Sequence, residues 1–385
     1  MSAQAIRHPG EFRWETRLLA VLTLMLTAMG IASCYASGAY VEKWFREASQ
    51  QGVAALVGGA VFLLAAKLDY RIWRKVALPA FIATLAGLVV IGIVAVIWRK
   101  QDAPGPLKDL FPYINGAHRW VRVGLQVQVS EIARFTLTVW LAAYCASLGN
   151  KVRDFNEGYL PLIGVIAIVC GLVALEPSVS MAGTLGIIGL TVVFTAGAKL
   201  PHVVTTVALA LLAMFLVLKF DAVRKQRTET FKGSTIECDV GKQECEALIG
   251  YGSGGINGVG FGNGTQKLGH TAEAYSDYLL SVIGEEWGFL GIVFIVACFT
   301  LFCWMGFRIS RTAPDPFGTY LAAGLTMSVG VTAFLHAAVV TAMMPSTGLT
   351  LPFMSVGRIS LLFYLLSAGV IVSIGRQRGR PARTK

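Results

Sequence analysis

Ten apolar runs of membrane-spanning length constrain this chain more than any other feature of its sequence. A helix needs about 20 apolar residues to cross the hydrocarbon core of a bilayer. Only 14% of the 385 residues are charged, which is too few to coat a water-soluble globule of this size. We therefore predict an all-α polytopic membrane protein with about ten transmembrane helices. The runs lie near residues 17–39, 52–66, 76–98, 127–147, 159–175, 180–198, 201–219, 276–305, 317–342 and 353–375.

The two ends of the chain flank a single transmembrane domain. We expect this domain over residues 17–375, between an N-terminal tail of residues 1–16 and a basic C-terminal tail of residues 376–385. No A-x-A-like cleavage site follows the first run, so we expect a retained helix and not a signal peptide. Lys and Arg are more frequent in the short loops on the side of the termini, which predicts that both termini are cytoplasmic. Basic loops facing an anionic membrane surface also account for the net charge of +11 without a nucleic-acid partner.

One connection, residues 220–275, is much longer than the others and is extracytoplasmic on this topology. Its centre, residues 252–264, is too rich in glycine for a helix, and is either a flexible tether or a weak candidate for a backbone cradle that binds phosphate. Cys238 and Cys245 lie in this loop, where an oxidising compartment would allow a disulfide. The other five cysteines fall in apolar runs as small core residues, and no Cys or His spacing predicts a protein-built metal site.

Two charged residues near the outer end of the fourth run form a candidate pair. Glu131 and Arg134 are three residues apart, so on a helix they share one face and can interact. Burying charge in a membrane is costly and calls for an explanation. One interpretation is an ion pair that lets the helix insert; the other is a polar cavity that receives a charged substrate.

A carboxylate stands at the start of the eighth run. Asp277 falls at the predicted boundary between water and membrane, and we expect Glu285 and Glu286 about two turns deeper. A partly buried carboxylate at the mouth of a cavity can act as a general base. The alternative for Asp277 is an N-cap that complements a helix dipole.

The stretch of residues 345–353 contains two prolines and a glycine within apolar surroundings. These residues predict a broken or re-entrant segment, because irregular backbone is tolerated in a membrane only where protein or a cavity receives it. Such segments are typical of the binding sites of transporters and of intramembrane enzymes.

Taken in this order, the clusters resemble the SEDS family (shape, elongation, division and sporulation), whose bacterial members include FtsW and RodA. Three ordered motifs carry the resemblance, which runs from residue 67 to about residue 375. They are Gly-Ala-x-Arg-Trp…Gln-Pro-Ser-Glu, Glu-Ala-His-Thr-Asp-Phe…Glu-Glu-x-Gly-Phe and Pro-x-x-Gly-x-x-Leu-Pro-Phe-x-Ser. Residues 262–268 and 345–353 are more similar to the FtsW division branch than to RodA. The matching positions are Gly116, Ala117, Arg119, Trp120, Gln128, Ser130, Glu131, Glu273, Ala274, Asp277, Glu285, Glu286, Gly288, Phe289, Pro345, Gly348, Leu351, Pro352, Phe353 and Ser355.

Several departures mark this chain as a divergent member. Val129 stands where the family has proline, and Arg134 stands where it has lysine. A family Pro-Asp-x-Gly motif is replaced by residues 177–180, which read Pro-Ser-Val-Ser and lack its carboxylate. A family Gly-Gly-Ser-Ser motif is replaced by residues 357–360, which read Gly-Arg-Ile-Ser.

The resemblance implies a peptidoglycan glycosyltransferase of the bacterial cytoplasmic (inner) membrane that polymerises lipid II at the outer face, during cell division. It implies that Asp277 is the catalytic base for the attacking hydroxyl, and that undecaprenyl pyrophosphate is the leaving group. A lipid-facing groove between spans would admit the polyprenyl tails. The candidate substrate-binding residues are Arg119, Glu131, Arg134, Lys267, Glu273, Ser355 and Arg358.

The leaving diphosphate needs positive charge, either from a divalent cation (Mg or Mn) or from basic side chains. The resemblance implies no organic cofactor. The expected partners are a class B penicillin-binding protein, which is a transpeptidase, and other divisome proteins. Two alternatives are a flippase for the lipid-linked precursor and a non-catalytic divisome scaffold. The clustering of polar motifs toward the outer face disfavours the flippase, and the retention of Asp277 disfavours the scaffold.

Overall fold

The computed structural model of the chain describes ten long helices, in agreement with the ten predicted runs. Within the described residues, eight of them are long and apolar enough to cross a membrane, and α7 and α8 are shorter apolar helices. The protein is thus an α-helical, multi-pass membrane protein. The described residues are 13–38, 42–98, 104–105, 107–114, 117–176, 178–220, 243–265, 277–345 and 347–377. The long helices are α1 (Arg13–Gly38), α2 (Glu42–Lys67), α3 (Ile72–Ile97), α5 (Val129–Leu148), α6 (Leu160–Leu175), α7 (Val179–Thr195), α8 (Leu200–Phe220), α11 (Leu279–Arg311), α12 (Pro316–Val340) and α13 (Arg358–Arg376).

A short β-hairpin precedes α5, and the sequence did not predict it. Strands β1 (Trp120–Val123) and β2 (Leu125–Gln128) are antiparallel, with Trp120 opposite Gln128. Gly124 makes the turn with a φ of +71°, a conformation that glycine adopts without steric cost. The fourth span therefore begins at Val129 and not at residue 127, because the two preceding residues pair across the hairpin. The remaining short elements are α4 (Leu107–Leu110), η1 (Gly149–Arg153), η2 (Phe155–Tyr159) and α10 (Gln243–Gly254).

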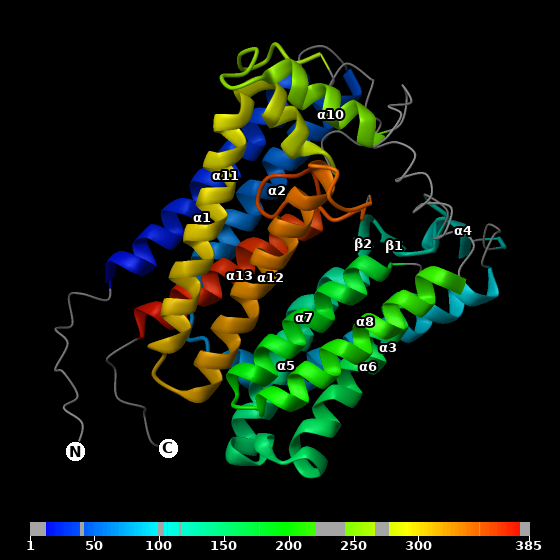
Figure 1. Cartoon of the computed structure of the whole chain (residues 1–385), viewed down its shortest axis with the longest axis vertical. Helices are drawn as coiled ribbons and strands as arrows, with labels where there is room; N and C mark the ends of the chain where they lie inside the picture. The colour runs from blue at the N-terminus through cyan, green and yellow to red at the C-terminus, as the bar shows by residue number, and fades with distance from the viewer. Residues whose placement is uncertain are drawn as a thin grey trace.

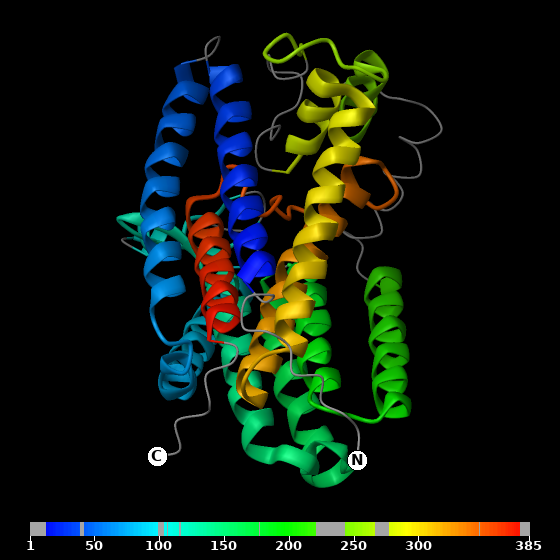
Figure 2. The same ribbon diagram turned by 90° about the vertical axis from the view of Figure 1, so that its left-hand side faces the viewer.

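The buried apolar side chains form two main clusters. The first is built mainly from α1, α2, α11, α12 and α13, and the second mainly from α3, α5, α6 and α7. Figures 1 and 2 show these two groups of helices side by side, with α12 reaching toward both. Many outward-facing side chains are large and apolar, such as Leu56, which is 78% exposed. An exposed apolar surface of this kind suits lipid and not water.

Helix α8 stands at the edge of the bundle, as Figure 2 shows in green. Near its first turns, the Tyr159 hydroxyl lies 2.6 Å from Thr206 Oγ1 and donates to the His202 carbonyl oxygen at 2.9 Å. Further along, Leu209 and Leu211 are 61% and 66% exposed. The described contacts of α8 are therefore concentrated at one end.

The connections between helices alternate between two sides of the bundle. One side, which we call the Asp315 side, is held by polar contacts between chain segments. Arg308 pairs with Glu15 at 2.8 Å, and Asp315 accepts hydrogen bonds from Tyr70 and from Arg71 at 2.5 and 3.1 Å. Thr16 and Gly375 pack together on this side. The first turn of α1 and the last turn of α13 thus lie on the same side, while their cytoplasmic orientation stays a prediction.

The opposite side, which we call the loop-rich side, carries α10 and a reversal within α11. Gly288 has φ 68° and ψ −166°, so α11 consists of a short first part and a long second part. Figures 1 and 2 show the short part beside α10, at the end of the long part. Glu285 and Glu286 therefore lie at the loop-rich end of the fold, and our expectation that they lie deeper in the membrane than Asp277 was wrong. The reason is the reversal at Gly288, which hydropathy does not reveal.

The glycine-rich stretch packs against this short part of α11. The expectation that its glycines exclude a helix was wrong for residues 252–254, which complete α10. A Cβ added at Gly254 would lie only 2.2 Å from the Gly284 carbonyl oxygen, so glycine is needed here for close approach and not for flexibility. Val259 N and Gly260 N donate to the carbonyl oxygens of Glu285 and Glu286, both at 3.0 Å.

Candidate functional site

The connection between α12 and α13, residues 341–357, folds back into the bundle, and we call it the re-entrant loop. Figure 1 shows it in orange near the middle of the molecule. Its Leu351, Phe353 and Met354 are buried within the first apolar cluster, whereas Leu349 packs in the second. The loop therefore joins the two groups of helices, as the proline and glycine pattern predicted for a segment received by protein.

Two helices hold the backbone of the re-entrant loop. The Gln51 side chain, from α2, donates to the Ser355 carbonyl oxygen at 2.9 Å and accepts from Gly357 N at 3.3 Å. His336, from α12, places its Nδ1 2.8 Å from the Leu349 carbonyl oxygen. The Ser355 hydroxyl accepts from Leu351 N at 2.9 Å, so its side chain contributes to the shape of the loop. Sequence reasoning overlooked Gln51 and His336; His336 is a polar side chain within an apolar run, and Gln51 directly precedes one.

Asp277 lies next to the re-entrant loop, although 71 positions separate it from Gly348. A Cβ added at Gly348 would be 3.7 Å from the Asp277 Oδ2. The Asp277 side chain is half-buried, so it borders both the bundle and the outside. The N-cap position of α11 belongs to Tyr278, which disfavours the N-cap interpretation of Asp277.

Glu131 and Arg134 form the predicted ion pair, and both are buried. The Arg134 guanidinium also donates to Tyr364 Oη, from α13, and to Thr332 Oγ1, from α12, the latter at 3.2 Å. Its centre lies 4.3 Å from the Tyr364 ring centroid. Phe353 of the re-entrant loop packs on the same ring, with centroids 5.8 Å apart. The pair thus ties α5 to two other helices beside the loop.

Arg119 and a residue that sequence reasoning missed, Glu176, influence each other on the loop-rich side. Arg119 directly precedes β1 and is half-buried. Glu176 follows the last residue of α6 and is fully buried. Burial raises the pKa of the Glu176 carboxyl to about 8, and the positive charge of Arg119 limits this rise. The only sequence signal for Glu176 was a carboxylate at the end of an apolar run.

The remaining predicted substrate-binding residues are Arg358, Lys267 and Glu273. Arg358 is exposed and is the first residue of α13, directly after the re-entrant loop. Lys267 and Glu273 lie outside the described residues.

Glu285 Oε1 accepts hydrogen bonds from Thr265 N and Thr265 Oγ1, at 2.8 and 3.0 Å. Because Glu285 holds the glycine-rich stretch in this way, a flexible tether does not fit residues 252–265, while a backbone phosphate cradle there stays a prediction.

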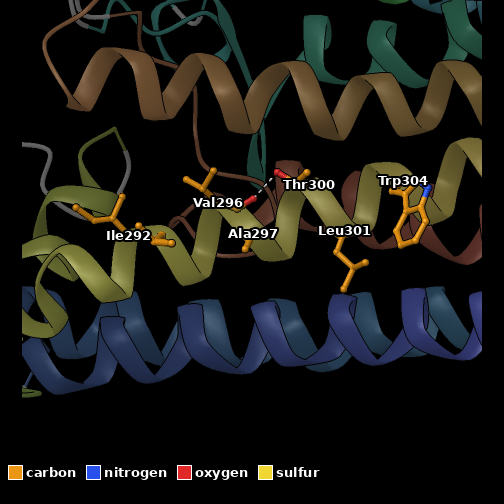
Figure 3. A pocket seen from close by; sticks show the side chains of 7 residues that line it. Ile292, Val296, Ala297, Thr300, Leu301 and Trp304 are labelled. Carbon is orange, nitrogen blue, oxygen red and sulfur yellow. Dashed lines mark hydrogen bonds between the residues drawn. The ribbon is translucent and has the colours of Figure 1, made fainter.

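A shallow apolar hollow of about 610 Å³ lies away from these residues, along one face of α11. Figure 3 shows its side chains, from Ile292 to Trp304, all projecting from α11. Its one hydroxyl, of Thr300, donates to the Val296 carbonyl oxygen of the same helix. This surface carries no group for chemistry, and its exposure suits lipid.

The described residues contain no group of three or more His, Cys, Asp or Glu side chains arranged to hold a metal ion. Of the two loop cysteines, Cys245 is disulfide-bonded, and Cys238 lies outside the described residues. Cys34, Cys145 and Cys298 are buried free thiols, as expected for small core residues.

Comparison with known proteins identifies the family. The family described as "Cell cycle protein", FtsW/RodA/SpoVE, matches residues 14–380. The chain is 32% identical to the "Probable peptidoglycan glycosyltransferase FtsW" of Geobacter sulfurreducens over 372 residues, 94% of this chain and 96% of the relative.

Two solved structures share the fold. One, titled "Structural coordination of polymerization and crosslinking by a peptidoglycan synthase complex", has a TM-score of 0.74 at 23% identity and covers 94% of this chain and 98% of its own. The other is the rod shape determining protein RodA of Thermus thermophilus, with a TM-score of 0.65 at 24% identity, covering 94% and 97%. With the ten long helices of its described residues, its re-entrant loop and these matches along nearly its whole length, the chain belongs to the FtsW/RodA/SpoVE family of cell cycle proteins.

Proposed function

We infer that this protein is a peptidoglycan glycosyltransferase that polymerises lipid II at the outer face of the bacterial inner membrane, during cell division. The relative named as a probable peptidoglycan glycosyltransferase FtsW matches 94% of the chain. The observation that carries the proposal is the half-buried Asp277 carboxylate next to Gly348 of the re-entrant loop. For Asp277 to act at the outer face, the loop-rich side must face outward and the Asp315 side must face the cytoplasm.

Asp277 serves as the general base in this proposal. The attacking hydroxyl oxygen of the acceptor sugar forms a bond to the anomeric carbon of the donor. The bond from that carbon to the diphosphate oxygen breaks, and its electron pair leaves with undecaprenyl pyrophosphate. The hydroxyl proton passes to an Asp277 carboxylate oxygen. A positioned base of this kind typically contributes about 10²–10⁴-fold to the rate.

Basic side chains on the loop-rich side bind the leaving diphosphate and neutralise its negative charge. Arg119 is half-buried there, and the exposed Arg358 follows the re-entrant loop; Lys267 is a further candidate. Arg134 is enclosed by Glu131, Thr332 and Tyr364, so we assign it to shaping the site and not to direct phosphate contact. A divalent cation, Mg or Mn, would be bound mainly by the diphosphate itself, because the described residues offer no cluster of ligands.

The polyprenyl tails need an apolar path into the bundle. A crevice of about 160 Å³ between α3, α5 and α13 is lined by apolar side chains such as Trp73, Phe135 and Phe363. Phe135 directly follows Arg134, so the crevice runs close to the buried ion pair. We also propose a class B penicillin-binding protein as partner, which would cross-link the strands that this protein polymerises, together with other divisome proteins.

The test is polymerisation of labelled lipid II by the purified protein, with and without a class B penicillin-binding protein. Asp277→Asn keeps the size and shape of the side chain but removes its basicity, so polymer should fall by about 10²–10⁴-fold while lipid II binding is retained. Glu157→Gln, an exposed change on the Asp315 side, is the matched control and should leave polymerisation unchanged. A folded Asp277→Asn protein that polymerises normally would refute the assignment, and a wild-type protein that only moves lipid II between leaflets would favour the flippase.

A further inference from the structure

His336 contacts the re-entrant loop at the point where the loop passes from the surface into the bundle. The described residues from 341 to 348 are exposed or half-buried, whereas residues 349–355 are buried apart from the half-buried Thr350. His336 lies about one turn before the end of α12 and is 1% exposed. Its Nδ1 lies 2.8 Å from the Leu349 carbonyl oxygen, at the boundary between the exposed and the buried half of the loop.

The hydrogen bonding of the imidazole shows what His336 contributes. A carbonyl oxygen can only accept, so we assign the ring hydrogen to Nδ1, which leaves Nε2 as an acceptor. Nε2 is buried and has no hydrogen-bond partner among the described residues. Buried polar atoms almost always have a partner, and an apolar side chain would fill this space at lower cost. What the imidazole adds to the fold is therefore the bond from Nδ1 to Leu349.

The buried half of the loop is held in place by contacts that do not involve His336. Gln51 holds the backbone at Ser355 and at Gly357. The ring of Phe353 packs among three aromatic rings from α11 and α13. Loss of the imidazole should therefore leave this half in place.

The exposed half of the loop is attached to α12. The backbone amides of residues 341–344 donate to carbonyl oxygens of the last turn of α12. Of the described residues from Pro345 to Leu349, Leu349 is the one with a hydrogen bond, and its partner is His336. The Leu349 side chain packs in the second apolar cluster, which fixes its depth in the bundle but not the direction of its carbonyl group.

This exposed half borders the proposed base. Gly348 directly precedes Leu349, and a Cβ added to it would lie 3.7 Å from the Asp277 Oδ2. Gly348 has a φ of +67°, a left-handed conformation that glycine adopts without steric cost. Glycine adopts many other conformations as readily, so the bond that holds the next residue selects this one.

We propose that His336 is a positioning residue of the candidate site: its Nδ1–H holds the Leu349 carbonyl group and thereby keeps Gly348 beside the Asp277 carboxylate. The consequence for catalysis rests on the proposed function, in which Asp277 is the base, whereas the consequence for the loop does not. A misplacement of about 1 Å in a catalytic site can cost about 10²-fold in rate. Loss of the bond should therefore lower turnover, and lipid II binding should persist because the buried His336 does not touch the substrate.

The effect on the loop is measured in the full-length protein in nanodiscs, with a nitroxide label on Thr347→Cys. His336→Leu removes the donor and keeps a buried apolar side chain, so the spectrum should shift toward that of a mobile label. His336→Met, a second side chain without a donor, should behave in the same way. His336→Asn should restore the wild-type spectrum, because its amide nitrogen can donate from about the position of Nδ1. The protein without the added cysteine gives the background.

Thr326→Val is the matched control. Thr326 is also buried on α12, and its Oγ1 has no hydrogen-bond partner in the described part of the chain. This change removes a buried polar atom from the same helix without touching the loop. It should leave both the label spectrum and the turnover as in the wild type.

The effect on the reaction is measured with the unlabelled variants on lipid II, and the number of lipid II binding sites gives the amount of folded protein. His336→Leu should lower kcat per binding site roughly 10–100-fold with KM near the wild-type value, and His336→Asn should restore most of the turnover. A residue that only stabilises the fold would instead reduce the number of binding sites and leave kcat per site unchanged.

The inference is overturned by a wild-type label spectrum in His336→Leu, by an unchanged kcat per site, or by His336→Asn behaving like His336→Leu. A label that responds as expected in a protein whose wild type makes no polymer would sink the proposed function and leave the role of His336 in the loop intact. Polymer from the wild type, with no response of the label to His336→Leu, would sink this inference alone.

Discussion

The buried charges of this protein differ in what surrounds them. Arg134 contacts Glu131, Thr332 and Tyr364, so its charge is balanced within the fold. Glu176 has no hydrogen-bond partner among the described residues. The first arrangement was predictable, because two charges three residues apart on a helix must share a face. The second was not, because burial of a single carboxylate depends on how α6, α7 and the hairpin segment meet.

At this scale we predict that breaking the Glu131–Arg134 pair costs more than removing it. Arg134→Ala should lower the free energy of unfolding by about 3–5 kcal/mol, because it leaves the Glu131 carboxylate buried and alone. The double change Glu131→Leu with Arg134→Met should cost far less, since no charge remains buried. Thermal unfolding in detergent measures both. Lys151→Ala, which breaks an exposed pair with Glu157, serves as control and should have little effect.

The same double variant separates two roles of the pair. If the pair only shapes the fold, the stable double variant should polymerise lipid II nearly as well as the wild type. Loss of polymer at normal stability would show that these charges act on the substrate. An Arg134→Ala protein as stable as the wild type would show that the pair matters little to the fold.

At the scale of elements, hydropathy predicted the helices well and their interruptions poorly. The ten apolar runs correspond to ten helices because spanning length is set by the bilayer and can be read from composition. The hairpin of residues 120–128 was not found because its two strands have only four residues each and the second runs directly into the apolar fourth span. The reversal at Gly288 was not found because it depends on contacts with Ile256 and Gly258, which are distant in sequence. The glycine-rich stretch was wrongly interpreted as a flexible tether for the same reason: Gly254, Gly258 and Gly264 allow close approach to α11.

We predict that Gly288 is intolerant of any side chain. Gly288→Ala places a Cβ 2.4 Å from Gly258 N, at φ 68° and ψ −166°, a region almost confined to glycine. The variant should lose more than about 2 kcal/mol of stability and expose residues 255–265 to proteases. Gly255→Ala is the matched control: its φ is also positive, at +54°, but no atom lies within 4 Å, so it should lose about 1 kcal/mol. Equal losses in the two variants would show that the contact with Gly258 is unimportant.

At the scale of the whole molecule, the re-entrant loop joins two groups of helices and brings distant residues together. Leu349 packs in one apolar cluster and Phe353 in the other, and Gly348 lies beside Asp277. The sequence predicted each of these motifs separately, and the family resemblance predicted that they belong to one site. Their mutual distances required the fold, because helix order along the chain does not fix which helices are neighbours.

The orientation of the bundle leads to a topology prediction. Asn263→Cys, exposed on the loop-rich side, should react in intact cells with a membrane-impermeant maleimide. Lys151→Cys, 68% exposed on the Asp315 side, should react only after the membrane is permeabilised. The parent protein without added cysteines gives the background. The reverse pattern would place Asp277 on the cytoplasmic face and exclude polymerisation at the outer face.

The one-ended attachment of α8 has a consequence for the membrane in which the protein resides. Its 21 residues span about 32 Å as a helix, close to the thickness of an average hydrocarbon core. When a bilayer is thinner or thicker, a helix adapts most cheaply by tilting. The tightly packed helices resist this, whereas α8 can pivot about its contact with Tyr159, because Val203, near that same end, is its one described residue packed against either apolar cluster. We therefore expect acyl-chain length to change the tilt of α8 and to leave the surroundings of the re-entrant loop unaltered.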